Sequence, residues 1–296
     1  MTESGTALDP RLNAFRDDLA DATLEGRVTA GRFAEGRPAE IARGVVDLRR
    51  EPDAGSGLDS QLLFGETVTV FDEADGWAWV QNRTDGYVGY VESAALGEAP
   101  SPPTHRVTAL RSFLFPEPDL KAPPLDSLSI ASPLCIIGHE GDYAALQGGG
   151  YIYRKHIAPI AESEPDYVAT ALRFLGTPYY WGGRSSVGLD CSTLVQLSLA
   201  CAGLPVRRDT YQQETTAGEA LNGLPGEIAL QRGDLIFSPG HVAIVLDAGM
   251  LEAARIVHAN AFTMTVAIED LEALEGRVRA ETGGGFTAVR RIPQGN

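Results

Sequence analysis

The order of hydrophobic and polar positions divides the chain into two β-rich segments followed by a mixed one. Four short runs of alternating apolar and polar residues, GVVDLRR, ETVTVFDE, GWAWVQNR and GYVGYVES, lie between residues 43 and 96, separated by Gly, Asp and Pro. Such alternation is typical of strands with one buried face, and four or five strands in so short a segment predict a small barrel. The Pro-rich stretch GEAPSPPT, at 97–104, predicts a stiff linker.

The second β-rich segment weakly repeats the first. ADGWAWVQ at 74–81 resembles EGDYAALQ at 140–147, and DGYVGYV at 85–91 resembles GGYIYRK at 149–155. Two copies are too few for a solenoid, so tandem β domains over 38–98 and 103–160 are predicted. Residues 1–37 are polar and acidic, and we interpret them as an arm that packs on a domain or stays partly disordered, with a short helix near Leu12 to Leu19.

Residues 161–296 carry both helical and strand-like patterns. SEPDYVATALRFLG predicts a helix with Ser163 as N-cap and Gly176 as its stop, and LDCSTLVQLSLACAG predicts a second helix that is apolar nearly all round and therefore buried. Strand-like runs follow at 234–238, 241–249, 255–261, 262–270 and 286–292, with a Pro-Gly turn between the first two. Helices first and an antiparallel sheet afterwards predict an α+β domain.

Composition narrows the range of partners. The chain has 24 Lys and Arg against 40 Asp and Glu, a net charge of −16, which argues against nucleic acid and against an anionic membrane surface. A cationic group in the substrate would suit this acidic excess. The chain lacks a membrane-length apolar run, and its first residues have neither a basic nor an apolar leader region, so a cytoplasmic location is expected. Three sparse Cys residues suit a reducing compartment, and without zinc-type spacing no metal or cofactor is expected.

Three residues are candidates for chemistry. Cys191 stands at the predicted N-terminus of the buried helix, where the helix dipole and free N–H groups would lower the thiol pKa. His241 opens a strand directly after a turn and could serve as a base for the thiol. His258, on the next strand-like run, could orient that base, since adjacent antiparallel strands place such residues side by side. Spacing alone makes this combination only moderately specific.

The sequence around these residues provides a stronger signal. GTPYYWGGRSSVGLDCSTLVQ at 176–196, RRDTYQQ at 207–213, RGDLIFSPGHVAIVLDAG at 232–249 and VHANA at 257–261 resemble, in this order, the motifs of the NlpC/P60 family of cysteine peptidases. The resemblance implies a papain-like domain with Cys191 as nucleophile, His241 as general base and then acid, and His258 as the orienting residue. It also implies that Tyr179 lies near the nucleophile and helps to bind the oxyanion. Trp181 is expected to serve in aromatic packing.

The two β domains resemble bacterial SH3-like barrels. An α+β papain-like NlpC/P60 catalytic domain preceded by two small all-β SH3-like barrels is similar to the γ-D-glutamyl-L-diamino acid endopeptidases, also described as dipeptidyl-peptidase VI. This resemblance implies hydrolysis of the bond between γ-D-Glu and the diamino acid in cell-wall muropeptides, in peptidoglycan recycling. The implied partner is the muropeptide L-Ala-γ-D-Glu-diamino acid with a free N-terminal L-Ala.

The same resemblance implies a pocket for the free amine. Asp190 would bind the amine and could also cap the helix, and Ser192 and Thr210 would line the same pocket. In such enzymes the first barrel supplies a Tyr and an acid, for which Tyr87 and Asp59 are the candidates here. The runners-up for these two positions are Tyr90 and Glu66.

Two other functions stay open at this stage. One is a wall-remodelling peptidoglycan hydrolase that accepts stem peptides still linked to glycan. The other is an SH3-type binding protein whose catalytic domain is degenerate. A periplasmic location of the protein would favour the first alternative. Selective labelling of Cys191 by an electrophile would count against the second.

Overall fold

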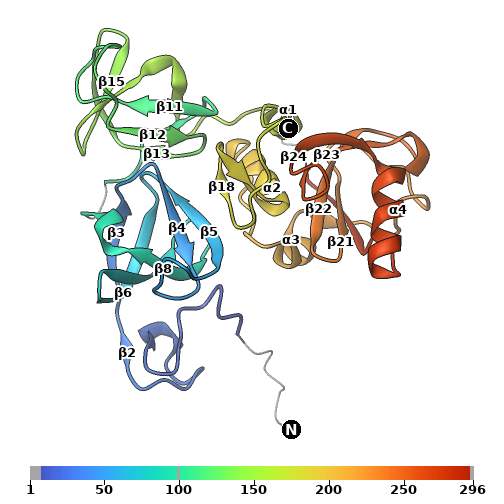
Figure 1. Cartoon of the computed structure of the whole chain (residues 1–296), viewed down its shortest axis with the longest axis horizontal. Helices are drawn as coiled ribbons and strands as arrows, with labels where there is room; N and C mark the ends of the chain where they lie inside the picture. Colours follow the sequence, from blue (N-terminus) through green and yellow to red (C-terminus); the bar gives the residue numbers. More distant parts are fainter. Residues whose placement is uncertain (1–7, 99–100, 294–296) are drawn as a thin grey trace. The chain divides into compact units, whose positions relative to one another are not determined.

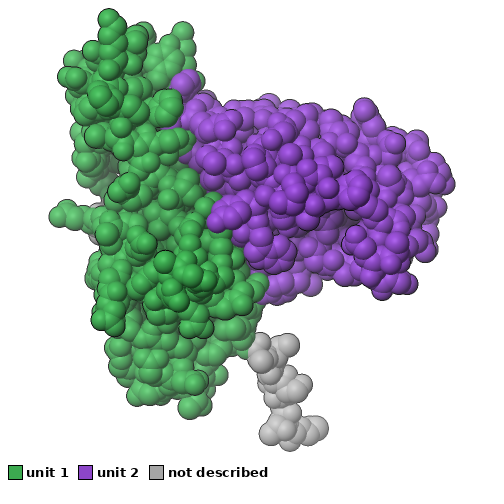
Figure 2. Space-filling view, viewed as in Figure 1, with its two compact units in different colours: residues 1–106, 113–128, 132–155 green, residues 107–112, 129–131, 156–296 purple. Residues whose placement is uncertain are grey.

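The structure is a computed structural model that describes residues 8–98 and 101–293 (Figure 1). The linker predicted at 97–104 therefore lies partly outside the described residues. Contacts divide the chain into two compact units (Figure 2). The first comprises the described residues up to 106, with 113–128 and 132–155, and the second comprises 107–112, 129–131 and the described residues from 156 onward.

The first barrel is a seven-stranded antiparallel sheet in the order β5-β4-β8-β7-β6-β3-β9. Its elements are β3 (Arg37–Ile41), β4 (Val45–Arg49), β5 (Leu58–Leu63), β6 (Thr67–Ala74), β7 (Trp77–Asn82), β8 (Val88–Glu92), η2 (Ser93–Ala95) and β9 (Leu96–Gly97). The four runs predicted as strands form β4, β6, β7 and β8. Strand β3 was missed because RPAEI begins with an exposed Arg and Pro, and β5 because LDSQLL buries the polar Ser60 and Gln61; tertiary pairing overrides these weak patterns.

The N-terminal arm packs on this barrel. Its short elements are β1 (Ala20–Asp21), η1 (Ala22–Leu24) and β2 (Phe33–Ala34). Ala14 and Leu19 are buried against Phe71 and Trp79 of the barrel, and the Arg16 guanidinium lies 4.7 Å from the centroid of the Trp79 ring. The packed arm is thus confirmed for its described residues. The helix expected near Leu12 to Leu19 is wrong, because this segment forms tight turns closed by backbone hydrogen bonds.

The second β-rich segment consists of short strands. They are β10 (His105–Val107), β11 (Arg111–Leu114), β12 (Asp126–Ser129), β13 (Pro133–Leu134), β14 (Ile136–Glu140), β15 (Tyr143–Leu146), β16 (Tyr151–Tyr153), η3 (Arg154–His156) and β17 (Ile157–Pro159). Strands β14, β15 and β16 form one antiparallel sheet. The hairpin β15–β16 corresponds to β7–β8 in the first barrel, as the internal sequence repeat predicts.

The C-terminal domain is the predicted α+β structure. Its elements are α1 (Tyr167–Leu172), β18 (Arg184–Ser185), β19 (Gly188–Leu189), α2 (Cys191–Cys201), α3 (Thr210–Thr216), β20 (Glu219–Ala220), β21 (Leu235–Ser238), β22 (His241–Asp247), η4 (Leu251–Ala253), β23 (Arg255–Asn260), β24 (Thr265–Asp270), α4 (Leu271–Thr282) and β25 (Ala288–Arg291). The main sheet has the order β20-β25-β21-β22-β23-β24, with antiparallel neighbours throughout. Helix α2 packs against β22 and β23 of this sheet.

Two details of the helices differ from the prediction. Helix α1 begins after Asp166 rather than Ser163, because the Asp166 carboxylate accepts hydrogen bonds from two N–H groups of the first turn. Helices α3 and α4 were not predicted, although Leu271, Leu274 and Val278 of α4 recur at helical spacing and are buried. Among the described residues, no helix is long and apolar enough to cross a membrane.

Candidate active site

Three elements of the C-terminal domain meet at the sulfur of Cys191. Cys191 is the first residue of α2 and is buried. Its Sγ lies 3.7 Å from the hydroxyl of Thr210, the first residue of α3. The backbone N–H of Val242, next to His241 on β22, also lies close enough to the thiol to favour its ionised form. The thiol is therefore held beside the start of the strand that carries the predicted base.

The surroundings of Cys191 favour the neutral thiol. Burial raises the pKa of Cys191 to about 11, and the Asp190 carboxylate adds to this rise. The Val242 N–H, the Thr210 hydroxyl and the Arg208 guanidinium oppose the rise without cancelling it. The lowered pKa expected from the helix N-terminus is thus wrong for the resting site, since loss of hydration outweighs the helix contribution. A base must therefore take the thiol proton before or during attack by sulfur.

His241 and His258 lie side by side on neighbouring strands, as the sequence predicted. Nε2 of His241 is 2.8 Å from Nδ1 of His258, and the two rings meet edge to face. Burial lowers the pKa of His241 to about 4 and that of His258 to about 3. Both imidazoles are therefore neutral at pH 7. Nδ1 of His241, the ring nitrogen that does not contact His258, is the atom left to take a proton from the thiol.

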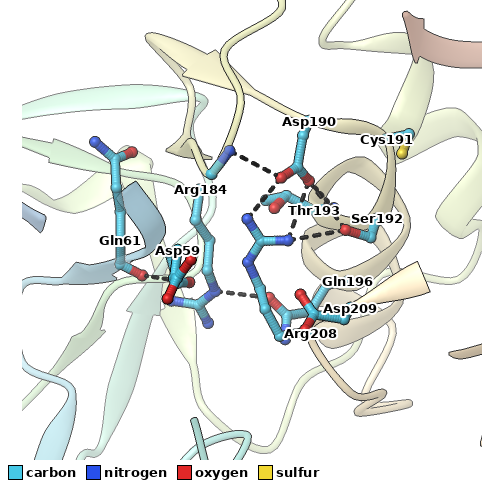
Figure 3. Close-up of polar contacts among 12 residues, drawn as sticks. Asp59, Gln61, Arg184, Asp190, Cys191, Ser192, Thr193, Gln196, Arg208 and Asp209 are labelled. Carbon is cyan, nitrogen blue, oxygen red and sulfur yellow. Dashed lines mark hydrogen bonds and ion pairs between the residues drawn. The ribbon is translucent and has the colours of Figure 1, made fainter. Parts of the chain in front are cut away.

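A buried ion pair borders the nucleophile on its N-terminal side (Figure 3). Arg208 donates to both oxygens of Asp190, at 3.1 and 2.7 Å, and to Oγ of Ser192 at 2.8 Å. Asp190 also caps α2 by accepting from the Thr193 N–H at 2.9 Å. Although burial opposes ionisation, the Arg208 guanidinium holds the pKa of Asp190 below its usual range. Asp190 is thus a charged N-cap whose charge is compensated within the protein.

Arg208 was missed by the sequence analysis although it stands inside the motif RRDTYQQ. The available signal was indirect, since an acid buried beside the nucleophile requires a cation close by. The N-cap role expected for Asp190 is confirmed. Its role in binding an amine stays a prediction, and the carboxylate oxygens already accept hydrogen bonds from Arg208, Ser192, Thr193 and Gly182.

The loop before α2 positions Tyr179 beside the nucleophile. Burial raises the pKa of Tyr179, and the charges of Cys191 and Asp190 raise it further, so its phenol stays protonated and can donate. Gly182 adopts a φ of 76°, and its N–H donates to Asp190 at 3.1 Å. The aromatic packing expected for Trp181 is wrong, because its side chain is 70% exposed.

Tyr87 and Asp59, the two candidates from the first barrel, have clear places within that unit. Tyr87 is buried in the hydrophobic cluster of the barrel. Asp59 lies on β5, where its carboxylate accepts from Arg50 at 2.6 Å. The runner-up Glu66 is buried and accepts from the backbone N–H of Leu63 at 2.9 Å. A role of these residues in the substrate pocket stays a prediction.

Over residues 8–98 and 101–293, no group of three or more His, Cys, Asp or Glu side chains is arranged to hold a metal ion. The arrangement at Cys191 instead combines a thiol, a neutral imidazole and a second imidazole that orients it. These are the parts that nucleophilic catalysis by cysteine needs.

Comparison with known proteins agrees with this geometry. Residues 176–273 match the NlpC/P60 family, and residues 48–96 match the bacterial dipeptidyl-peptidase SH3 domain. Residues 176–273 thus form an NlpC/P60 domain. The protein is therefore a cysteine peptidase with an SH3-like domain on the N-terminal side of its NlpC/P60 domain.

Several known proteins resemble this chain over most of its length. Dipeptidyl-peptidase 6 of Lysinibacillus sphaericus is 26% identical over 83% of this chain and 96% of its own. The γ-D-glutamyl-L-lysine dipeptidyl-peptidase of Bacillus cereus is 28% identical over 67% of this chain and 68% of its own. The crystal structure of an NlpC/P60 family protein from Bacillus cereus covers 87% of this chain and all of its own, with a TM-score of 0.70 and 21% identity. This last likeness confirms the fold.

Proposed function

We propose that the protein hydrolyses the bond between γ-D-Glu and the diamino acid of cell-wall muropeptides that have a free N-terminal L-Ala. The observations that carry this proposal are the buried thiol of Cys191 at the start of α2, which packs on the strands of His241 and His258, and the hydrogen bond between these two histidines. The names of two relatives, dipeptidyl-peptidase 6 and γ-D-glutamyl-L-lysine dipeptidyl-peptidase, support the substrate class.

In the proposed reaction, Nδ1 of His241 accepts the thiol proton while Sγ of Cys191 attacks the γ-carbonyl carbon of D-Glu. The backbone N–H of Cys191 and the hydroxyl of Tyr179 donate to the developing oxyanion. His241 then gives the proton to the amine nitrogen of the diamino acid, which leaves, and a thioester remains. Water, deprotonated by His241, hydrolyses the thioester and releases L-Ala-D-Glu.

In the proposal, the pocket recognises the free α-amino group of L-Ala, which is a cation below its pKa of about 8. Asp190 and Arg208 together carry no net charge, so Asp190 alone provides little attraction for a second cation. A further carboxylate is therefore part of the proposal. The chain's net charge of −16 favours a cationic group in the substrate.

We place this reaction in peptidoglycan recycling in the cytoplasm. In the proposal, a muropeptide exposes the amine of L-Ala only after another hydrolase has separated the peptide from the glycan. The substrate is thus an already trimmed peptide rather than intact wall. A pocket closed behind the amine would suit such a substrate and would exclude peptides that are still linked to glycan.

A cleavage assay with purified protein separates the proposal from its alternatives. The substrates are L-Ala-γ-D-Glu-diaminopimelate and the same peptide with an acetylated N-terminus, and mass spectrometry detects the products. Release of L-Ala-D-Glu from the free peptide only is the expected result. Cleavage of both peptides would indicate a wall-remodelling hydrolase, and cleavage of neither would favour a binding protein or another acyl substrate. The same assay with L-Lys in the third position identifies the diamino acid.

A further inference from the structure

His258 faces two groups of opposite hydrogen-bonding character at the same ring nitrogen. Its Nε2 lies 3.0 Å from Nδ2 of Asn260 and 3.2 Å from Oε2 of Glu269. Asn260 Oδ1 accepts from both the N–H and the hydroxyl of Thr263, at 2.8 and 3.0 Å, which fixes the amide with its NH₂ group toward His258. One neighbour of Nε2 is therefore a donor and the other is an acceptor.

The choice between these neighbours determines the proton positions in both histidines. A neutral imidazole carries one proton. If Nε2 of His258 donates to Glu269, Nδ1 of His258 is a lone pair and accepts from Nε2–H of His241. If Nε2 of His258 accepts from Asn260 instead, Nδ1–H of His258 donates to His241, and the proton of His241 then lies on Nδ1.

Only the first arrangement suits the reaction. Nε2 of His241 contacts His258, so the thiol proton of Cys191 must go to Nδ1 of His241. Nδ1 can accept this proton only when it carries a lone pair, as it does when Glu269 is the partner of His258. We propose that Glu269 is a positioning residue that fixes the tautomers of His258 and, through it, of His241.

Glu269 is well placed for this role. It lies on β24, next to β23, which carries His258. Arg277 of α4 donates to both oxygens of Glu269, so the carboxylate is held in one orientation. The guanidinium of Arg277 lies 4.4 Å from the ring centroid of Phe262, which restrains it further. Glu269 cannot be recognised from local sequence patterns, because only the strand pairing brings it to His258.

The other charged groups near the histidines are Asp190, the N-cap of α2, and residues of α4. Asp190 and Glu269 favour protonation of His241, whereas burial and Arg277 oppose it more strongly. Arg277 itself is held by Glu269 and lies in the field of Glu281. Burial keeps His258 neutral, and His241 and Arg277 reinforce this. The pair thus rests in neutral form, and a tautomer rather than a charge is what Glu269 selects.

The test compares Glu269→Ala with a rescue variant, Glu269→Ala/Asn260→Asp. In the rescue variant the new carboxylate retains an acceptor for Thr263 and presents an oxygen to Nε2 of His258 in place of the NH₂ group. ¹⁵N NMR of the histidine rings reports which nitrogen is protonated. We expect the His258 proton on Nε2 in the wild type, on Nδ1 in Glu269→Ala, and on Nε2 again in the rescue variant.

Two further variants separate tautomer control from general stability. Arg277→Met removes the ion pair but retains the carboxylate, so the His258 proton should stay on Nε2. Glu275→Ala, which removes a carboxylate that pairs with Arg279 on α4, should leave tautomers and turnover unchanged. A His258 proton on Nε2 in Glu269→Ala, or on Nδ1 in the wild type, would overturn the proposal.

The catalytic consequence rests on the proposed function and is measured separately. With the free muropeptide, kcat of Glu269→Ala should fall about 100-fold or more with KM nearly unchanged, and the rescue variant should recover most of it. If the wild type cleaves no muropeptide, the proposed function fails, whereas the NMR result still decides the role of Glu269. An unchanged kcat in a Glu269→Ala enzyme that cleaves the peptide would count against the role in catalysis.

Discussion

Arg208 and Asp190 form an ion pair that is buried on both sides, and Asp190 directly precedes the nucleophile in the chain. Arg208 also donates to Ser192, so one guanidinium supports the N-cap and the first turn of the helix that begins with Cys191. The pair links the segment before α3 to the start of α2. Its loss should therefore affect both stability and the position of the thiol.

Arg208→Met should lower the free energy of unfolding by about 3–5 kcal/mol, because it leaves the Asp190 charge buried without a partner. The double variant Arg208→Met/Asp190→Asn should recover part of this loss, since no isolated charge remains. Urea denaturation measures both values. The matched control is Arg279→Met, which removes an exposed pair with Glu275 and should cost no more than about 0.5 kcal/mol. Equal effects of the two single variants would contradict this account.

The same pair changes how Asp190→Asn tests amine binding. The substitution removes a charge that the amine would contact in the proposal, but it also leaves Arg208 buried without its counter-ion. Activity should therefore fall on the free peptide, and the variant should also unfold at lower urea. Arg208→Met/Asp190→Asn is the cleaner test, because a residual loss of kcat/KM in this variant no longer reflects an isolated cation. Recovery of kcat/KM to the wild-type value would remove Asp190 from the amine pocket.

Local patterns predicted much of this fold. Strands β4, β6, β7 and β8, helix α2 and the β22–β23 pair follow from alternation, turn residues and a continuous apolar run. The positions of Cys191, His241 and His258 were predicted from flanking motifs, and the contact of the two histidines from strand adjacency. These features depend on residues close in sequence or on adjacent strands.

Features that depend on distant partners were not predicted. The pairing of Arg208 with Asp190, the contact of Glu269 with His258 and the raised pKa of Cys191 result from burial and from elements that meet only in the folded domain. A sequence pattern reports which residues tend to be buried but not which charge faces which. The exposure of Trp181 illustrates the same limit.

The half-buried His241 and the buried His258 should make stability depend on pH. Their pKa values in the folded state lie below the usual 6.5, so the unfolded chain binds more protons between pH 6.5 and about 4. Stability is therefore full above pH 6.5 and falls as the pH drops through this window, by about 3 kcal/mol for His241. Urea midpoints measured between pH 7 and 4 should decline less in the double variant His241→Asn/His258→Asn than in the wild type. The exposed His139→Asn should keep the wild-type pH dependence.

Two glycine substitutions should have opposite effects. In Gly183→Ala, the new Cβ would lie 2.6 Å from the carbonyl oxygen of Gly188, so the loop before Cys191 must shift. We expect lower stability and a lower kcat. Gly276 lies inside α4 with no atom within 4 Å of a new Cβ, so Gly276→Ala should stabilise the protein by about 1 kcal/mol. Thermal unfolding of both variants checks the signs, and a tolerated Gly183→Ala would show that the loop is not tightly packed.

The pH dependence of kcat/KM should show that His241 and His258 are neutral in the resting enzyme. His241 must be unprotonated to accept the thiol proton, so kcat/KM should have an acid limb near pH 4. On the alkaline side, the substrate amine loses its charge near pH 8, and kcat/KM should fall there if the pocket recognises a cation.

The pH dependence of Cys191 alkylation by iodoacetamide reports the titration of the enzyme alone, because the reagent has no amine that titrates. In a Cys135→Ala background, the rate should rise with pH toward about 11, since only the thiolate reacts and burial disfavours it. A plateau already reached at neutral pH would mean that the thiolate is paired with a protonated His241. Transfer of the proton would then precede substrate binding, and the acid limb of kcat/KM would report the ion pair instead of a neutral imidazole.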